Sequence, residues 1–456
     1  MKIKMICLKK SKRQFIFKNF IFNRTISPCR YIKNTSSSLR VNFNVLNMSK
    51  KVGIYIPGLG ETYRKESGEK YAKRFMRQLD YNNTESKTDY KLTVEKLQYG
   101  DGEQLSTQQI TIWEQKDGQE TEVYRFYEYQ YASVLTGSFD QKNVFVKSLI
   151  LFGNVIVKLP MIFFRVFYTG KQVGYRPRYR GETLFLFLIF LLMSLAVLFL
   201  LPAAIGLILT SMGESKDFTS LLGKLNISPE KLKTFSQTIL NITAVVLILM
   251  PGANTIVTAL ATEFSCATGY LNSGERKQKI HGQLDELIEF ICEKEGNDTE
   301  IGFHTYSFGS IVAMDYLFPF GIEPSRRLLH NVKGLVTIGC PFDFIQLYFG
   351  GFFNQRNVAV GKNIVWINVY SLADALASNL RKTNTKGEAE YSIPGSSLKP
   401  VNLNYELTNI RPNIVFQLLS MYSVRVHASY WDQDDDGQSC LSLIVKELQQ
   451  QNIFQS

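Results

Sequence analysis

The chain has 456 residues, 45% of them hydrophobic, which excludes a mostly disordered protein and leaves room for one large domain with an added module, or for two domains. Its net charge of +12 comes almost entirely from residues 1–47, which hold seven lysines, four arginines and no acidic residue. Residues 48–456 carry 41 basic and 40 acidic side chains, so the rest of the chain is close to neutral, which argues against a nucleic-acid-binding surface.

Residues 1–47 have the composition of a targeting segment rather than of a folded domain. They are basic, rich in Ser and Asn and free of acidic residues, as is typical of a mitochondrial transit peptide. The other interpretation is an upstream extension of the reading frame, with Met48 as the working start just before the first strand. Under either interpretation we expect this segment to lie outside the fold.

The next part of the chain, residues 48–143, alternates between strand-like and helical patterns. Apolar or alternating runs predict strands at 51–57, 92–99, 110–114 and 122–129. Asp117-Gly118, between the last two runs, predicts a tight hairpin. A glycine-rich turn at 58–60 follows the first strand, and a polar stretch with a helical pattern extends from there to Leu79.

Residues 144–270 form a membrane insertion in our interpretation. No charged residue occurs between Thr183 and Gly213, and an apolar run of this length can cross a hydrocarbon core of ~30 Å as a helix. A second uncharged run, Thr234–Thr262, is interrupted by a Pro-Gly pair, which membrane helices tolerate. We therefore expect transmembrane helices at about 184–210 and 235–262; the alternative for the second run is a buried helix packed on the first.

The stretch Val144–Phe167 is apolar but contains Lys147, Lys158 and Arg165. Because a basic side chain at mid-bilayer costs ~3 kcal/mol, this stretch predicts an amphipathic helix in the membrane interface, with an ordinary core helix as the alternative. Lysine and arginine are enriched before the first predicted crossing. The positive-inside rule then places the remaining domain in the cytoplasm, or in the mitochondrial matrix if the chain begins with a transit peptide.

Residues 271–456 resume the alternation of strands and helices. Helical patterns at 278–294 and 311–317 alternate with strand-like runs at 301–303, 335–339 and 364–370. This order predicts an α/β fold, with a mainly parallel sheet covered by helices on both faces. The six cysteines are scattered without a C-x-x-C pair, which indicates neither a disulfide framework nor a zinc site.

Ser307 is the strongest candidate for chemistry. It follows a strand-like run and precedes the helical run that starts at Ile311, within Thr305-Tyr306-Ser307-Phe308-Gly309. A serine at the apex of a sharp strand-to-helix turn exposes its hydroxyl beside a helix N-terminus, which favours developing negative charge. We therefore predict that Ser307 is a nucleophile.

The predicted base is chosen from four histidines, because a serine needs a neighbouring group to take its proton. His304 precedes Ser307 on the same strand and should point away from the active edge, and His281 lies on the preceding helix. In sheet enzymes of this type the acid falls between the nucleophile and the histidine in the sequence, which disfavours His330. His427, in an apolar segment that we interpret as a strand, remains.

The acid should lie at the carboxyl end of a strand, where it can hold the imidazole in one tautomer. Asp374 meets this condition, four residues after the strand that ends at Tyr370, and Asp343 is the alternative. Two backbone N–H groups should also stabilise the developing oxyanion, each worth ~3 kcal/mol. Phe308 would supply one, and Leu59 or Gly60 the other.

These motifs resemble those of the α/β-hydrolase superfamily, in its lipase- or esterase-like branch. The resemblance covers residues 51–135 and 275–445, and it implies a Ser307–Asp374–His427 triad that cleaves an ester or thioester through an acyl-enzyme. The family's usual Gly-x-Ser-x-Gly begins here with Thr305, which should crowd the turn, and its usual His before the serine is Tyr306. Asp374 also lacks the proline that often follows such an acid.

We therefore expect a membrane-anchored serine hydrolase whose partners are the lipid bilayer and an acyl-ester substrate. The alternatives are a catalytically inactive hydrolase fold that serves as a membrane interaction protein, and an acyltransferase with the same triad. No metal or other cofactor is expected. The acidic segment 432–437 matches the start of an EF-hand loop, but Leu443 stands where a bidentate glutamate is required.

Overall fold

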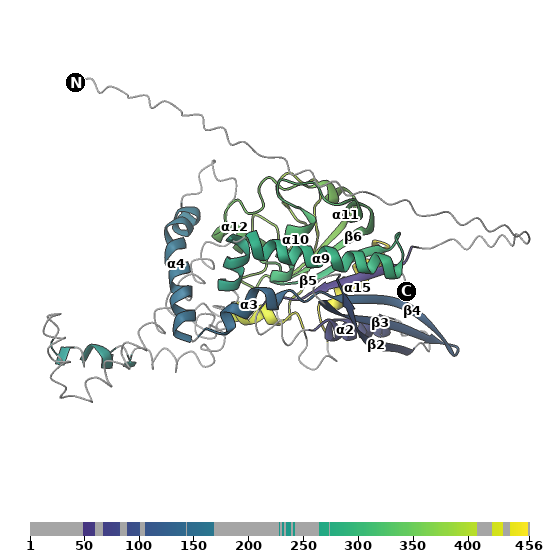
Figure 1. The fold of residues 1–456 in the computed structure, drawn as a ribbon, viewed down its shortest axis with the longest axis horizontal. Coiled ribbons are helices and arrows are strands. Elements are labelled where there is room, and N and C mark those ends of the chain that lie inside the picture. The colour runs from purple at the N-terminus through teal and green to yellow at the C-terminus, as the bar shows by residue number, and fades with distance from the viewer. Residues whose placement is uncertain are drawn as a thin grey trace, which may run out of the picture. The chain divides into compact units, whose positions relative to one another are not determined.

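In the computed structural model, eight strands form one sheet in the order β2-β3-β4-β1-β5-β6-β7-β8 (Figure 1). The strands are β1 (Lys51–Ile56), β2 (Asp89–Tyr99), β3 (Leu105–Lys116), β4 (Gln119–Glu128), β5 (Glu300–Tyr306), β6 (Val332–Ile338), β7 (Val365–Tyr370) and β8 (Val401–Asn404). All neighbouring pairs from β4 to β8 are parallel, whereas β3 pairs antiparallel with both β2 and β4. The predicted α/β class with a mainly parallel sheet is therefore confirmed.

The structure describes residues 49–59, 67–82, 89–100, 105–142, 144–167, 264–272, 274–407, 422–431 and 438–454, together with a few residues between 228 and 241. All of them belong to one compact unit, Ser49–Ser456. The predicted targeting segment and the predicted crossing at 184–210 lie outside the described residues, as does most of the predicted crossing at 235–262. Among the helices that are described, none combines the length and the apolar character needed to span a bilayer.

Helices cover both faces of the sheet. They are α2 (Gly68–Asn82), α3 (Ala132–Asp140), α4 (Val144–Phe167), a helix at 264–272, α9 (Gly274–Glu295), α10 (Phe308–Leu317), α11 (Arg326–Asn331), α12 (Phe342–Tyr348), α14 (Tyr422–Arg425) and α15 (Leu441–Gln450), with short 3-10 turns η1 (Ala359–Lys362) and η2 (Val426–Ala428). Ile54 and Ile56 of β1 pack in the core that contains α9 and α10, whereas Tyr55 packs with α2 and α15. This alternation is the period-two pattern of a strand buried on both sides.

The turn between β3 and β4 forms as the Asp-Gly pair predicts. Asp117 and Gly118 both have positive φ, at 52° and 79°. Two such residues in succession suit the tight two-residue connection of an antiparallel hairpin, because its backbone twist matches that of the strands. The hairpin extends the sheet beyond β4, so β1 becomes an interior strand.

The position of β1 defines the edge where a ligand can bind. Strands β2 to β4 lie on one side of β1 and strands β5 to β8 on the other, so the strand order reverses there. In open α/β sheets the crevice outside the carboxyl ends of the strands, at such a reversal, is the usual binding site. The segments after β1, β5, β6 and β7 meet at this edge.

Candidate active site

Ser307 occupies a strained turn between β5 and α10. Its backbone has φ 51° and ψ −126°, and its N–H donates to the carbonyl of Ile338 at 2.8 Å. A positive φ is unfavourable for a residue with a side chain and persists where the surroundings hold it. Gly309 permits this turn, because a Cβ there would fall within 2.5 Å of the backbone oxygen of Ile56. The nucleophile turn therefore packs directly on the end of β1.

Thr305 fits the turn that it was expected to crowd. Its side chain is fully buried, and its hydroxyl lies 2.8 Å from the carbonyl oxygen of Val336 and 2.9 Å from the hydroxyl of Ser310. These two contacts link β5 to β6 and to the first turn of α10. A threonine in place of the small residue thus adds polar contacts beneath Ser307.

Ser307, His427 and Asp374 form a continuous hydrogen-bonded relay at this edge. Nε2 of His427 lies 2.7 Å from Oγ of Ser307, and Nδ1 lies 2.8 Å from Oδ2 of Asp374. An ionised carboxylate only accepts hydrogen bonds, so Nδ1 carries the proton and Nε2 of the neutral imidazole accepts from the serine hydroxyl. This is the tautomer that a general base requires.

Asp374 is held by three donors. Besides His427, it accepts the N–H of Leu376 at 2.9 Å and the hydroxyl of Tyr430 at 2.9 Å, and the same hydroxyl accepts the N–H of Ser371 at 2.9 Å. Burial, and then the negative charge of Asp374, raise the pKa of Tyr430 well above its ordinary value. Tyr430 therefore stays protonated and fixes the carboxylate rather than exchanging a proton with it.

Tyr306 positions the imidazole from the other side. Its hydroxyl donates to the backbone carbonyl of His427 at 2.7 Å, and the two rings stack with centroids 5.6 Å apart and planes 20° apart. Sequence reasoning treated Tyr306 as a departure from a family pattern and gave Tyr430 no role. Tyr306 directly precedes Ser307 and Tyr430 follows His427 by three residues, and this closeness in the sequence was the available signal.

The segment that carries His427 is helical, so its interpretation as a strand is wrong. Residues Tyr422–Arg425 form α14 and Val426–Ala428 form the 3-10 turn η2. The alternation around His427 extends over too few residues to distinguish a strand from a helical turn. The backbone carbonyl of Ser423 accepts the N–H of Ala375, which ties this turn to the loop that carries Asp374.

The other candidate residues lie elsewhere. His304 is fully buried between Tyr71 and Tyr124, with its Nδ1 2.8 Å from the Tyr71 hydroxyl, as expected of a core residue. His330 is mostly exposed and lies 3.4 Å from Asp298. Asp343, the alternative acid, accepts the hydroxyl of Tyr391 at 2.8 Å on α12.

Phe308 and Leu59, the predicted oxyanion donors, both lie beside Ser307. Phe308 is the first residue of α10, and the first N–H groups of a helix have no acceptor within the helix. Leu59 follows β1 and lines the same pocket as Ser307 and Phe308. The residue before it approaches closely, since a Cβ on Gly58 would lie 3.1 Å from Cβ of Ser307. Gly60, the other candidate donor, lies outside the described residues.

An apolar pocket of about 50 Å³ opens beside Ser307. Its lining consists of Leu59, Phe264, Ala267, Ser307, Phe308, Pro341, Phe344, Ile345, Phe349 and Leu376. Every lining residue other than Ser307 has an apolar side chain, and the walls come from the helix at 264–272 and from α12. The pocket is thus suited to a hydrocarbon group next to the serine hydroxyl.

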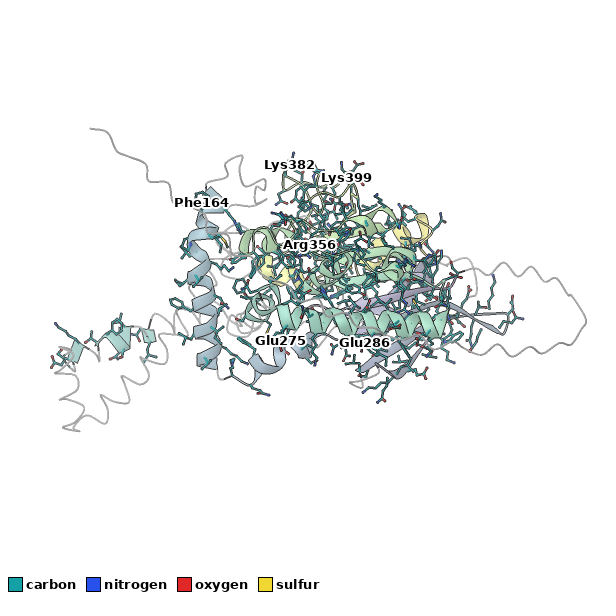
Figure 2. All side chains as sticks on the ribbon, turned by 45° about the horizontal axis from the view of Figure 1, so that its top comes forward. Phe164, Glu275, Glu286, Arg356, Lys382 and Lys399 are labelled. Atoms are coloured by element: carbon teal, nitrogen blue, oxygen red, sulfur yellow. The ribbon has the colours of Figure 1, made fainter. Side chains whose placement is uncertain are left out.

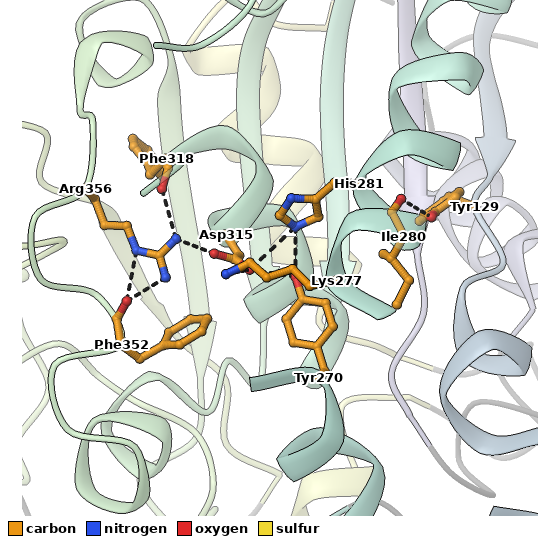
Figure 3. Close-up of polar contacts among 9 residues, drawn as sticks. All are labelled: Tyr129, Tyr270, Lys277, Ile280, His281, Asp315, Phe318, Phe352 and Arg356. Atoms are coloured by element: carbon orange, nitrogen blue, oxygen red, sulfur yellow. Dashed lines mark hydrogen bonds and ion pairs between the residues drawn. The ribbon is translucent and has the colours of Figure 1, made fainter. Parts of the chain in front are cut away.

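A second buried carboxylate, Asp315, lies about two turns along α10 from Ser307 (Figure 3). It pairs with Arg356 and with Lys277, the latter at 2.7 Å, and accepts the hydroxyl of Tyr270 at 2.8 Å. Nε2 of His281 lies 3.5 Å from it. Burial acts to raise the pKa of Asp315, but the hydrogen bond from His281 and the charges of Arg356 and Lys277 outweigh it and hold the pKa below its ordinary value.

The Asp315 cluster fixes one wall of the pocket. Tyr270 belongs to the helix at 264–272, which also supplies Phe264 and Ala267 to the lining. The Tyr270 ring packs edge-on against Phe308, with centroids 5.6 Å apart. The network therefore ties this helix to α10 just behind the nucleophile.

No family model, curated protein or solved structure matches this chain.

Proposed function

We propose that this protein is a serine hydrolase that cleaves a carboxylic or thio ester through an acyl-enzyme on Ser307. The observation that carries this proposal is the relay in which Asp374, His427 and Ser307 follow one another at 2.8 and 2.7 Å. The three residues lie more than fifty positions apart in the sequence and converge at the edge of the sheet where ligands bind. The apolar pocket beside Ser307 would hold the substrate next to these three residues.

The reaction follows from the proton positions. Oγ of Ser307 attacks the carbonyl carbon while Nε2 of His427 takes the hydroxyl proton, and Asp374 stabilises the imidazolium that forms. The N–H groups of Phe308 and Leu59 would donate to the oxygen that becomes negative. Collapse of the tetrahedral intermediate breaks the bond to the leaving alcohol or thiol, which takes the proton from His427. Water then attacks the acyl-enzyme by the reverse route and releases the carboxylic acid.

The pocket favours an acyl group without charge. A charged group would lose its hydration among these aromatic and aliphatic walls and find no partner there, whereas an alkyl chain would gain from burial. We further propose that the predicted crossings at 184–210 and 235–262 anchor the enzyme to a membrane, which would place such acyl esters within reach.

Labelling with a fluorophosphonate tests the proposal, because this reagent reacts with an activated serine. The full chain, solubilised in detergent, should be labelled in the wild type and unlabelled in Ser307→Ala. Ser310→Ala is the matched control: Ser310 is fully buried one turn further along α10 and should leave labelling intact. Absence of labelling in the wild type, or equal labelling in Ser307→Ala, would count against a hydrolase.

A further inference from the structure

The exposed residues of α4 whose side chains the structure describes are all apolar. Within this helix, the exposed residues whose side chains are described are Leu149, Gly153, Ile156, Val157, Pro160 and Phe164. They recur at spacings of three and four, so they form one stripe along the helix. Val157 is 76% exposed and Phe164 53% exposed, and Figure 2 shows Phe164 near one end of α4. Large side chains of this kind seldom face water as a continuous patch.

The charges of α4 point the other way, towards the protein. Nζ of Lys158 lies 4.4 Å from the centre of the Phe349 ring, and Nζ of Lys147 lies 5.5 Å from that of Phe139. Arg165 donates to the backbone carbonyls of Gln346 and Leu347 at the end of α12. The helix contains no acidic residue. Its polarity is thus inverted relative to a helix that covers a core in water.

The described segments on either side of the predicted crossings both pack on α12. The chain leads into these crossings from α4, which packs on α12 (Figure 1). It returns at Phe264, whose ring packs against Phe344 and Tyr348 of α12 with centroids 6.1 and 5.2 Å apart. Since α12 also lines the pocket beside Ser307, the pocket, α4 and Phe264 lie together.

We infer that the exposed face of α4 lies against the hydrocarbon of a lipid bilayer. A protein partner would need hydrogen-bonding groups at the contact, at roughly one bond per 100–200 Å² of interface, and this stripe offers no polar side chain. Hydrocarbon requires none. The two uncharged runs between α4 and Phe264 are each long enough to enter the same bilayer. The predicted interfacial helix, α4, would therefore lie with its cations against the protein and its apolar stripe in lipid.

The inference is tested with a fluorescent label on the full chain in lipid nanodiscs. An environment-sensitive dye is attached at Val157→Cys, in a background in which Cys7 and Cys29 are replaced by Ser; the other four cysteines are buried. The matched control is Tyr81→Cys: Tyr81 is 71% exposed and lies on α2, a helix that packs on the other face of the sheet. Lipids that carry a quencher on their acyl chains are then introduced.

We expect the label at 157 to be blue-shifted and strongly quenched by the acyl-chain quencher, and the label at 81 to show neither effect. A label at 157 that behaves like the label at 81 would show that the stripe faces water and overturn the inference. A blue-shifted label that lipid does not quench would also overturn it, because another apolar segment of protein would then cover the stripe.

A second variant extends the test to substrate access, and this arm depends on the proposed function. Val157→Glu should lower the rate of cleavage of an ester dissolved in the bilayer several-fold while leaving the rate on a short water-soluble ester unchanged, with Tyr81→Glu as the control. A Val157→Glu variant that slows neither ester, or that slows both by the same factor, would oppose lipid contact at this face. A protein without esterase activity would fail with both esters and still show the quenching at 157, so the two proposals fail separately.

Discussion

The two buried carboxylates near α10 differ in what neutralises them. Asp374 is approached by a histidine, a tyrosine hydroxyl and a backbone N–H. Asp315 is approached by an arginine and a lysine as well as by Tyr270. A carboxylate paired with permanent cations has its charge compensated before any reaction. One that faces a neutral imidazole keeps its charge for the moment at which the imidazole becomes positive.

Under the proposed function, the comparison separates a catalytic role for Asp374 from a structural one for Asp315. In that mechanism Asp374 can stabilise a transient imidazolium, because none of its partners carries a permanent charge. Asp315 links α10, α9, the helix at 264–272 and the loop that carries Arg356, which gives the pocket a fixed wall (Figure 3). Substitutions at the two positions should therefore affect different quantities.

Asp374→Asn should have the largest effect on rate. The amide leaves the imidazole free to adopt the wrong tautomer, so kcat for ester cleavage should fall by about 10⁴-fold, as for the equivalent change in other serine enzymes. The melting temperature should change little, because the amide oxygen still accepts from Leu376 and the amide NH2, in the place of Oδ2, can donate to Nδ1 of His427. Steady-state kinetics on a chromogenic ester and a thermal melt measure the two quantities. A small fall in kcat together with a large fall in melting temperature would indicate that Asp374 has a structural rather than a catalytic role.

Asp315→Asn should show the opposite pattern. It leaves Arg356 and Lys277 without their counter-charge in a buried site, and breaking a buried pair from one side costs about 3–5 kcal/mol of unfolding free energy. Denaturant unfolding of the variant beside the wild type measures this loss. The fraction that remains folded should retain fluorophosphonate labelling, and loss of labelling in folded protein would give Asp315 a direct part in the reaction.

His304, the histidine buried in the core, extends the comparison to pH. Burial lowers the pKa of His304 from 6.5 to about 3, so the folded protein resists protonation that the unfolded chain accepts. The stabilising contribution is complete above pH 6.5 and is lost as the pH falls towards 3, at up to ~1.4 kcal/mol per pH unit. His304→Gln should therefore lose less melting temperature than the wild type between pH 7 and pH 5. Equal losses would argue that His304 is protonated in the folded state.

Tyr430→Phe should give the smallest effect of the four. It removes one donor to Asp374, and a hydrogen bond to a charged group contributes about 1.5 kcal/mol, so kcat should fall about tenfold. Tyr129→Phe is the matched control, since this buried hydroxyl donates to the carbonyl of Ile280 on α9 instead. If Tyr129→Phe lowered kcat as much as Tyr430→Phe does, the fall in kcat would come from a general loss of stability rather than from the lost hydrogen bond to Asp374.

Local patterns predicted the sheet class and the turn at Ser307. Continuous apolar runs indicate strands buried on both faces, and a strand-like run followed at once by a helical one indicates the turn. His427 was identified by elimination and by chain order, although its helical turn was misinterpreted as a strand. Tyr306 and Tyr430 could not be assigned, since their roles depend on how three loops pack at one edge. Asp315 stands in an otherwise apolar helical run, which signals a buried partner, but Arg356 and Lys277 are too distant in the sequence to be identified as that partner.

The most direct measurement is the mass of the Ser307 peptide after the protein meets an activated butyrate ester and is quenched in acid within the first turnovers. A butyryl group on Ser307, absent in Ser307→Ala, is the predicted result. Turnover of the ester with the acyl group on another residue, or with no covalent adduct at any time, would contradict an acyl-enzyme at this serine.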